Sequence, residues 1–181
     1  MILNMESKLR NSVVMLYGNP ATGKTTASRK IRDYFETRTT VDLISTFKIR
    51  EELGLTDLHS TEQRAQVYQE LTRRVESCLA RQIVKCVILD GNFNKRHRRE
   101  EVYSLARTNG YDVYVVGCEV SNLDEIQRRF QIREQTPDLL EHRAATMDLY
   151  DMIKGSTDPI EDDLAEDGGI VFVRNNTELG V

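Results

Sequence analysis

The eight residues from Gly18 to Thr25 constrain this chain more than any other stretch. They fit the phosphate-binding pattern G-x-x-x-x-G-K-[ST] without a mismatch. The two glycines allow positive φ and a close approach of the backbone to a polyphosphate, because no Cβ stands in the way. Inward-pointing amides, the lysine ammonium and the N-terminus of the next helix all favour an anion. We therefore expect a nucleotide triphosphate to be bound by Gly18, Asn19, Pro20, Ala21, Thr22, Gly23, Lys24, Thr25 and Thr26.

The sequence on either side of this loop has the order that such a loop requires. Residues 13–17 are an apolar run typical of a buried strand. In residues 26–35 the apolar side chains Ala27, Ile31 and Phe35 recur at helical spacing. Strand, loop and helix thus follow one another, which argues against a chance match in a glycine turn.

The rest of the chain alternates between strand and helix patterns. Further strands are expected at residues 40–45, 85–90, 112–120 and 170–173. Helices are expected at residues 47–53, at 60–81 with a capping box of Ser60 and Gln63, and at 95–109. Two more are expected, one after a cap formed by Ser121 and Asp124 and one from Thr136 with Pro137 to about Gly155, followed by an acidic loop at 161–167. This alternation predicts an α/β fold, a doubly wound parallel five-stranded sheet, with ligands beyond its carboxyl ends.

Length and charge limit the class of protein. The 181 residues suit a single domain spanning 1–181, and a net charge of −4 gives no general attraction to nucleic acid. Three cysteines, Cys78, Cys86 and Cys118, share no C-x-x-C spacing, so we expect no metal or redox role for them. No apolar run reaches the length of a membrane span, and residues 1–10 lack the apolar core of a signal peptide. We therefore expect a soluble, cytoplasmic protein without a membrane partner.

The predicted strand at 85–90 ends in a carboxylate. Four apolar residues there end in Asp90, which delivers the carboxylate to the edge of the sheet where ligands bind. Together with the Thr25 hydroxyl, this carboxylate is suited to supporting Mg²⁺ through a coordinated water. An aspartate at an ordinary strand-to-loop turn is the alternative.

Two groups of basic residues point to an anion outside the loop. Residues 95–99 place positive charge at the start of a helix, where it opposes the helix dipole. Either an anion binds there and reverses this penalty, or the run is a solvated basic face. Arg129 and Arg133 are four residues apart and share a helix face. An arginine near the transferring phosphoryl group stabilises its charge, so we favour a lid role for this pair over surface arginines neutralised by Glu125 and Glu134.

With these motifs, the chain resembles the small P-loop kinases, in particular the predicted-kinase group that includes the polynucleotide 5′-kinase domain and zeta-toxin-like enzymes. Besides the loop, residues 87–94 with Arg98 are similar to the family's third-strand motif, and residues 129–133 resemble its R-L-x-x-R lid motif. The resemblance covers nearly the whole chain. It implies a P-loop NTPase of the nucleoside-monophosphate-kinase type, with a lid segment at about 123–145.

The chain departs from that family after the second strand. Family kinases commonly read S-x-D-D-x-R there, and the first aspartate accepts the proton of the attacking hydroxyl. Here Phe47 and Lys48 replace both carboxylates, while Arg50 remains. A missing general base typically costs about 10²–10⁴ in rate, but phosphoryl transfer depends mostly on positioning and charge stabilisation. Alternative bases, left unranked, are Glu51, Glu52 and Asp42.

The leading hypothesis is an ATP-dependent kinase that uses Mg²⁺. Its expected catalytic residues are Lys24, Asp90, Arg129 and Arg133, and its expected acceptor site lies between Phe47, Arg50, Asn92 and Arg98. The acceptor would be a small hydroxyl compound, a class that includes already phosphorylated ones. Two alternatives stay open, namely a nucleotide-binding switch or weak NTPase, and a nucleic-acid 5′-hydroxyl kinase, which is not favoured. Asn175 and Asn176 are candidates for contact with the nucleotide base by position only.

Overall fold

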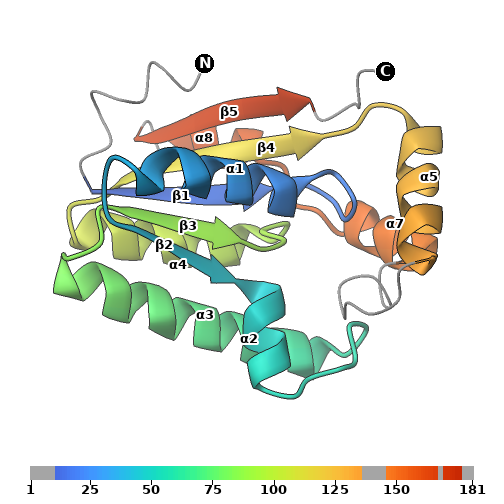
Figure 1. Ribbon diagram of the computed structural model, residues 1–181, viewed down its shortest axis with the longest axis horizontal. Helices are drawn as coiled ribbons and strands as arrows, with labels where there is room; N and C mark the ends of the chain where they lie inside the picture. The colour runs from blue at the N-terminus through green and yellow to red at the C-terminus, as the bar shows by residue number, and fades with distance from the viewer. Residues whose placement is uncertain (1–10, 136–145, 167–168, 177–181) are drawn as a thin grey trace.

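The computed structural model describes residues 11–135, 146–166 and 169–176. Its centre is a sheet in the strand order β2-β3-β1-β4-β5, and every strand pair is parallel (Figure 1). The strands are β1 (Ser12–Tyr17), β2 (Val41–Ser45), β3 (Cys86–Asp90), β4 (Asp112–Glu119) and β5 (Ile170–Asn176). The helices are α1 (Lys24–Glu36), α2 (Thr46–Glu52), α3 (Thr61–Arg81), α4 (Arg96–Thr108), α5 (Leu123–Glu134), α7 (Met147–Gly155) and α8 (Glu161–Glu166).

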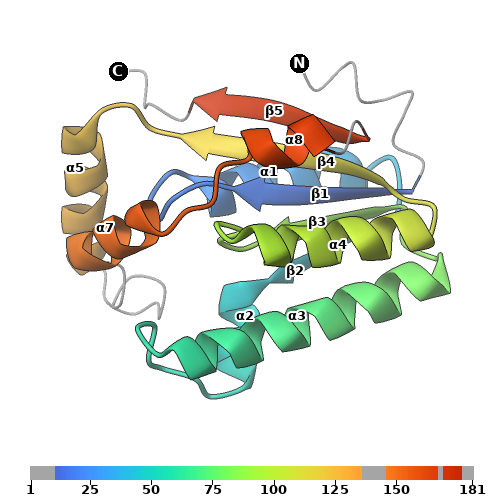
Figure 2. The ribbon, with the colours of Figure 1, turned by 180° about the vertical axis from the view of Figure 1, so that it is seen from behind.

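Helices cover both faces of the sheet, as the two opposite views show (Figures 1 and 2). Helix α1 lies on one face, where Phe35 packs with Val14 and Leu16 of β1. Helices α3, α4 and α8 lie on the other. Alternate β1 residues point to this second face, because side chains along a strand alternate between faces, and they pack against the α3 stripe Val67, Leu71, Val75 and Leu79. The predicted doubly wound, five-stranded parallel sheet is therefore confirmed.

The carboxyl ends of the strands meet at one edge, because all the strands run in the same direction. Helices α5 and α7 lie beyond that edge, and α2 leaves it directly after β2 (Figure 1). Residues that follow β1, β2 and β3 are thereby brought together from distant parts of the sequence. None of the described helices is long and apolar enough to cross a membrane.

Three local predictions need correction. The cap of α5 is Asn122, whose side chain accepts a hydrogen bond from the Asp124 amide, so neither Ser121 nor Asp124 is the cap. The expected acidic loop is instead the helix α8, because Asp163 is buried on its inner side and Ile160, just before it, packs in the core. Ser60 does cap α3, but the Gln63 side chain accepts from the Asp57 amide instead of completing a capping box.

The predicted helix from 136 to 155 is described only in part. Its start at Thr136 and Pro137 lies outside the described residues, as does the lid segment from 136 to 145. The described part is α7, which Thr146 caps by accepting a hydrogen bond from the Leu149 amide.

Candidate active site

The loop after β1 has the backbone conformation that its glycines predict. Gly18 has φ +140°, and a Cβ there would lie 2.3 Å from the carbonyl oxygen of Cys118 on β4. Gly23 has φ +92° and precedes the first turn of α1. Ala21 also has positive φ, at +62°, a conformation that costs a non-glycine residue roughly 1–2 kcal/mol. The loop is thus held in a strained, close-packed shape at the end of β1.

Hydrogen bonds within the loop fix its lysine. The Asn19 carbonyl accepts from Lys24 Nζ at 2.7 Å and from Thr22 Oγ1 at 2.8 Å. The ammonium is therefore held at the loop backbone, next to the N-terminus of α1, where positive potential is already concentrated. This arrangement of amides and ammonium suits a polyphosphate.

Asp90 lies buried at the end of β3, beside this loop. Burial raises the pKa of its carboxyl group, while the Lys24 charge and the hydroxyls of Thr25 and Ser28 act in the opposite direction. The Thr25 hydroxyl and the Asp90 carboxylate are hard oxygen donors, and they fit Mg²⁺, which keeps most of its ligands as water and phosphate. Among the described residues no group of three or more His, Cys, Asp or Glu side chains could hold a metal by itself.

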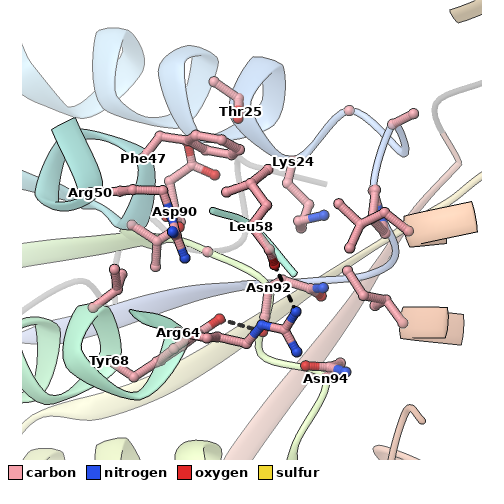
Figure 3. A pocket seen from close by; sticks show the side chains of 18 of the residues that line it. Lys24, Thr25, Phe47, Arg50, Leu58, Arg64, Tyr68, Asp90, Asn92 and Asn94 are labelled. Carbon is pink, nitrogen blue, oxygen red and sulfur yellow. Dashed lines mark hydrogen bonds between the residues drawn. The ribbon is translucent and has the colours of Figure 1, made fainter. Parts of the chain in front are cut away.

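One pocket joins the loop to the residues that follow β2 and β3 (Figure 3). From the predicted site it contains Pro20, Ala21, Gly23, Lys24, Thr25, Thr26, Phe47, Arg50, Asp90, Asn92, Arg98 and Arg133. The remaining predicted residues, Gly18, Asn19, Thr22 and Arg129, lie outside its lining. The structure thus brings the expected nucleotide and acceptor residues into a single cavity.

The two lid arginines are placed differently. Arg129 pairs with Glu125 at 2.7 Å and donates to the Ala21 carbonyl at 2.9 Å, so it holds α5 against the loop backbone. Arg128 pairs with the same carboxylate at 2.8 Å, and hydrogen bonds from the two arginines lower the pKa of Glu125 to about 2. Arg133, in contrast, lines the pocket.

Helix α2 forms part of the pocket wall. Arg50 is buried and donates to the carbonyls of Leu55 and Asp57, and burial followed by the nearby Arg64 charge lowers its pKa. Phe47 is half-buried and lines the pocket, whereas Lys48 is exposed.

The alternative bases do not reach this pocket. Glu51, Glu52 and Asp42 are exposed and lie outside its lining. Asp90 is therefore the one carboxylate among the described residues of the lining.

The basic run at 95–99 is not one surface. Arg98 faces the pocket, but Arg99 is fully buried in an ion pair with Asp163 of α8 at 2.6 Å. Lys95 lies 3.6 Å from Asp158, and Arg96 pairs with Glu100 along α4. Neither of the two open interpretations, an anion site or a solvated basic face, describes the whole run, because Arg98 lines the pocket and Arg99 forms a structural ion pair.

The sequence did not reveal the contribution of α3 to the pocket. Arg64, Val67 and Tyr68 line it, together with Leu58 just before the helix. Arg64 and Tyr68 are four residues apart, which places them on one face of α3. This spacing was the available signal, but it pointed to a pocket only once the neighbouring loop was known. Asn175 and Asn176 lie at the end of β5, outside the pocket lining.

The sequence was compared with protein families and with curated proteins. The family model described as AAA domain matches residues 13–151. A search of the curated proteins found no match.

Several solved structures are similar to this chain. Kti12 of Chaetomium thermophilum, solved in complex with ADP-AlF3, has 13% identity and a TM-score of 0.64 over 90% of this chain and 88% of that one. A sugar kinase of Janibacter sp. has 14% identity and a TM-score of 0.64 over 92% and 85%. The APS kinase CysC of Mycobacterium tuberculosis, in complex with AMPPNP and APS, has 16% identity and a TM-score of 0.55 over 70% and 72%. At these identities the likeness establishes a shared fold.

Proposed function

The chain belongs to the AAA domain family, and we propose that it is an ATP-dependent kinase that transfers the γ-phosphoryl group to a hydroxyl of a small molecule. The observation that carries this proposal is one pocket that contains both Lys24 of the phosphate-binding loop and the side chains of Phe47, Asn92 and Arg98. A nucleotide and an acceptor bound in one cavity can place their reacting atoms in contact, which is the main requirement of phosphoryl transfer. The kinases among the similar structures support kinase chemistry, and the sequence motifs favour a place near the polynucleotide-kinase and zeta-toxin-like group.

Each residue then has a distinct task. The loop amides and Lys24 bind the triphosphate, and Arg133 is placed to stabilise charge on the moving phosphoryl group. Arg129 positions the loop through the Ala21 carbonyl. Thr25 and Asp90 would hold Mg²⁺, which supplies neutralising charge to the phosphates when it is bound.

The proposed reaction proceeds without a dedicated carboxylate base at the acceptor end. Phe47 lines the pocket at the place where family members carry the first aspartate, and the described lining holds no carboxylate besides Asp90. Because the transition state of phosphoryl transfer is loose, positioning and electrostatics supply most of the rate. We therefore expect a slow kinase with strict requirements for acceptor placement.

Incubation of the full chain with γ-labelled ATP, Mg²⁺ and a panel of small hydroxyl compounds and oligonucleotides tests this proposal. We expect label on a small acceptor, and a loss of transfer of at least about 10²-fold in Lys24→Ala. Lys30→Ala, an exposed lysine on the same helix, is the matched control. Tight ATP binding without transfer to any acceptor or to water would identify a nucleotide switch instead. Absence of ATP binding would refute both.

A further inference from the structure

The pocket has a large excess of positive charge. Among the described residues, its lining contains Lys24, Arg50, Arg64, Arg98 and Arg133 against one carboxylate, that of Asp90. A triphosphate on the loop would account for Lys24. Figure 3 shows Arg64 and Asn92 on the side of the pocket away from Thr25, so a second negative group is needed there.

Arg98 is held in place by an aromatic ring. Its guanidinium lies 3.8 Å from the centre of the Tyr68 ring, and the Tyr68 hydroxyl donates to the Asn92 carbonyl. Stacking uses the face of a guanidinium and leaves its in-plane N–H donors available. No carboxylate of the described residues lies within ion-pair distance of Arg98. The side chain is thus oriented for an anion that the described part of the chain does not provide.

Arg64 lies one helical turn before Tyr68 and is similarly placed. One of its terminal nitrogens, Nη2, donates to the Leu58 carbonyl at 2.9 Å. No carboxylate among residues 11–135, 146–166 and 169–176 pairs with this guanidinium. It is also close enough to Arg50 to lower the pKa of that neighbour, after the larger effect of burial. Like charges gathered in a partly buried cavity are unfavourable unless an anion binds between them.

Asn92 adds a requirement of a different kind. Its Oδ1 atom is buried and accepts no hydrogen bond from the described residues. A buried acceptor left without a donor is costly, so native structures nearly always provide one. A hydroxyl or amine on a bound molecule would supply this donor.

We infer that the phosphoryl acceptor carries an anionic group, phosphate or carboxylate, that binds Arg64 and Arg98, together with a hydroxyl or amine that donates to Asn92 Oδ1. This inference rests on the proposed kinase function and names its substrate class. The charge-assisted bonds to the arginines would fix the acceptor in the cavity. Neutral polyols would lack that anchor.

The test measures anion binding directly, with the nucleotide loop already filled. The full chain is saturated with Mg²⁺ and a non-hydrolysable ATP analogue, and inorganic phosphate or acetate is titrated in while NMR follows the Nε–H signals of the arginines. Sodium chloride at equal ionic strength is the reference. We expect saturable shifts of the Arg64 and Arg98 signals with phosphate or acetate. The anion that binds more tightly identifies the anionic group of the acceptor. Removal of either arginine, in Arg64→Gln or Arg98→Gln, should weaken binding by about 10–100-fold, since each provides charge-assisted hydrogen bonds.

Controls separate this inference from the kinase proposal. Arg81→Gln, at an exposed position on the same helix as Arg64, should leave anion binding unchanged. Amide signals of Gly23 and Lys24 report nucleotide binding in the same samples, so a failure of the nucleotide site is seen separately. Nucleotide binding with non-saturable shifts equal to those in chloride would overturn the anionic acceptor and leave the kinase proposal standing. Anion binding that persists unchanged in both Arg64→Gln and Arg98→Gln would also overturn the inference of an anionic acceptor.

Discussion

Arg99 of α4 and Asp163 of α8 form a bidentate ion pair that is completely buried. Arg99 Nε lies 2.6 Å from Asp163 Oδ2, and Nη2 lies 2.9 Å from Oδ1. Tyr103 donates to the same carboxylate at 2.8 Å, and Arg99 Nη1 donates to the Phe93 carbonyl at 3.0 Å. The pair therefore fixes both α8 and the segment after β3, which contains the pocket residue Asn92.

Removal of one partner should destabilise the chain strongly. Asp163→Ala leaves the Arg99 charge buried and unpaired, a change that typically costs about 3–5 kcal/mol of unfolding free energy. Urea denaturation measures this loss. Asp33→Ala, which removes an ion pair with Arg32 at the surface, is the control and should cost no more than about 1 kcal/mol. Equal losses in the two variants would show that burial of the Arg99 pair has no structural importance.

Gly18 should tolerate a side chain far less than another glycine of positive φ. Gly110 has φ +72° with open space around its missing Cβ, so Gly110→Ala should cost about 1–2 kcal/mol of unfolding free energy from backbone strain alone. Gly18→Ala places a methyl group 2.3 Å from the Cys118 carbonyl oxygen, and such overpacking typically adds about 1–3 kcal/mol. Denaturation of both variants in urea compares the two costs. A smaller loss of unfolding free energy for Gly18→Ala than for Gly110→Ala would mean that β4 shifts to accommodate the methyl group.

The sequence predicted well wherever one local pattern determines one structure. The loop pattern specified the turn after β1, and the apolar run ending in Asp90 specified β3 and its carboxylate. Both depend on residues adjacent in sequence. Parallel pairing then brings the strand ends together, so the meeting of Lys24 with Asn92 in one pocket follows from the fold class.

Contacts between distant segments could not be predicted in this way. Arg98 and Arg99 are neighbours in a basic run, yet one faces the pocket and the other pairs with Asp163, 64 positions further on. The acidic stretch around Asp163 resembles a solvated loop until its partner is known. Likewise, Tyr68 becomes part of the site only because α3 packs next to the segment after β3 and places its ring under Arg98. Such partnerships are properties of tertiary packing.

The ion pairs of Glu125 should make stability depend on acid pH. Arg128 and Arg129 lower the pKa of this carboxyl group in the folded chain to about 2, below its ordinary 4.5. The folded state therefore binds this proton less tightly than the unfolded state, and the ion pairs stabilise above about pH 4.5 and are lost as pH falls toward about 2. Glu125→Gln should thus be less stable than the unmodified chain at pH 6, with a difference that disappears near pH 2. Glu134→Gln, on the same helix but without an ion pair to any described residue, should show no such pH dependence.

Asp90 should favour function at the expense of stability. The residue is 4% exposed, and burial raises the pKa of its carboxyl group in spite of the Lys24 charge. A carboxyl group whose pKa is raised in the folded state destabilises the chain once it is ionised at higher pH. Asp90→Asn removes this charge and should therefore raise the unfolding free energy of the nucleotide-free chain at neutral pH. The same change removes the carboxylate proposed to support Mg²⁺, so calorimetry should find that Mg²⁺ no longer strengthens ATP binding. Asp112→Asn, at the exposed start of β4, should change neither quantity. Destabilisation by Asp90→Asn would show instead that attraction to Lys24 outweighs burial, and Asp90 would then be a structural partner of the lysine.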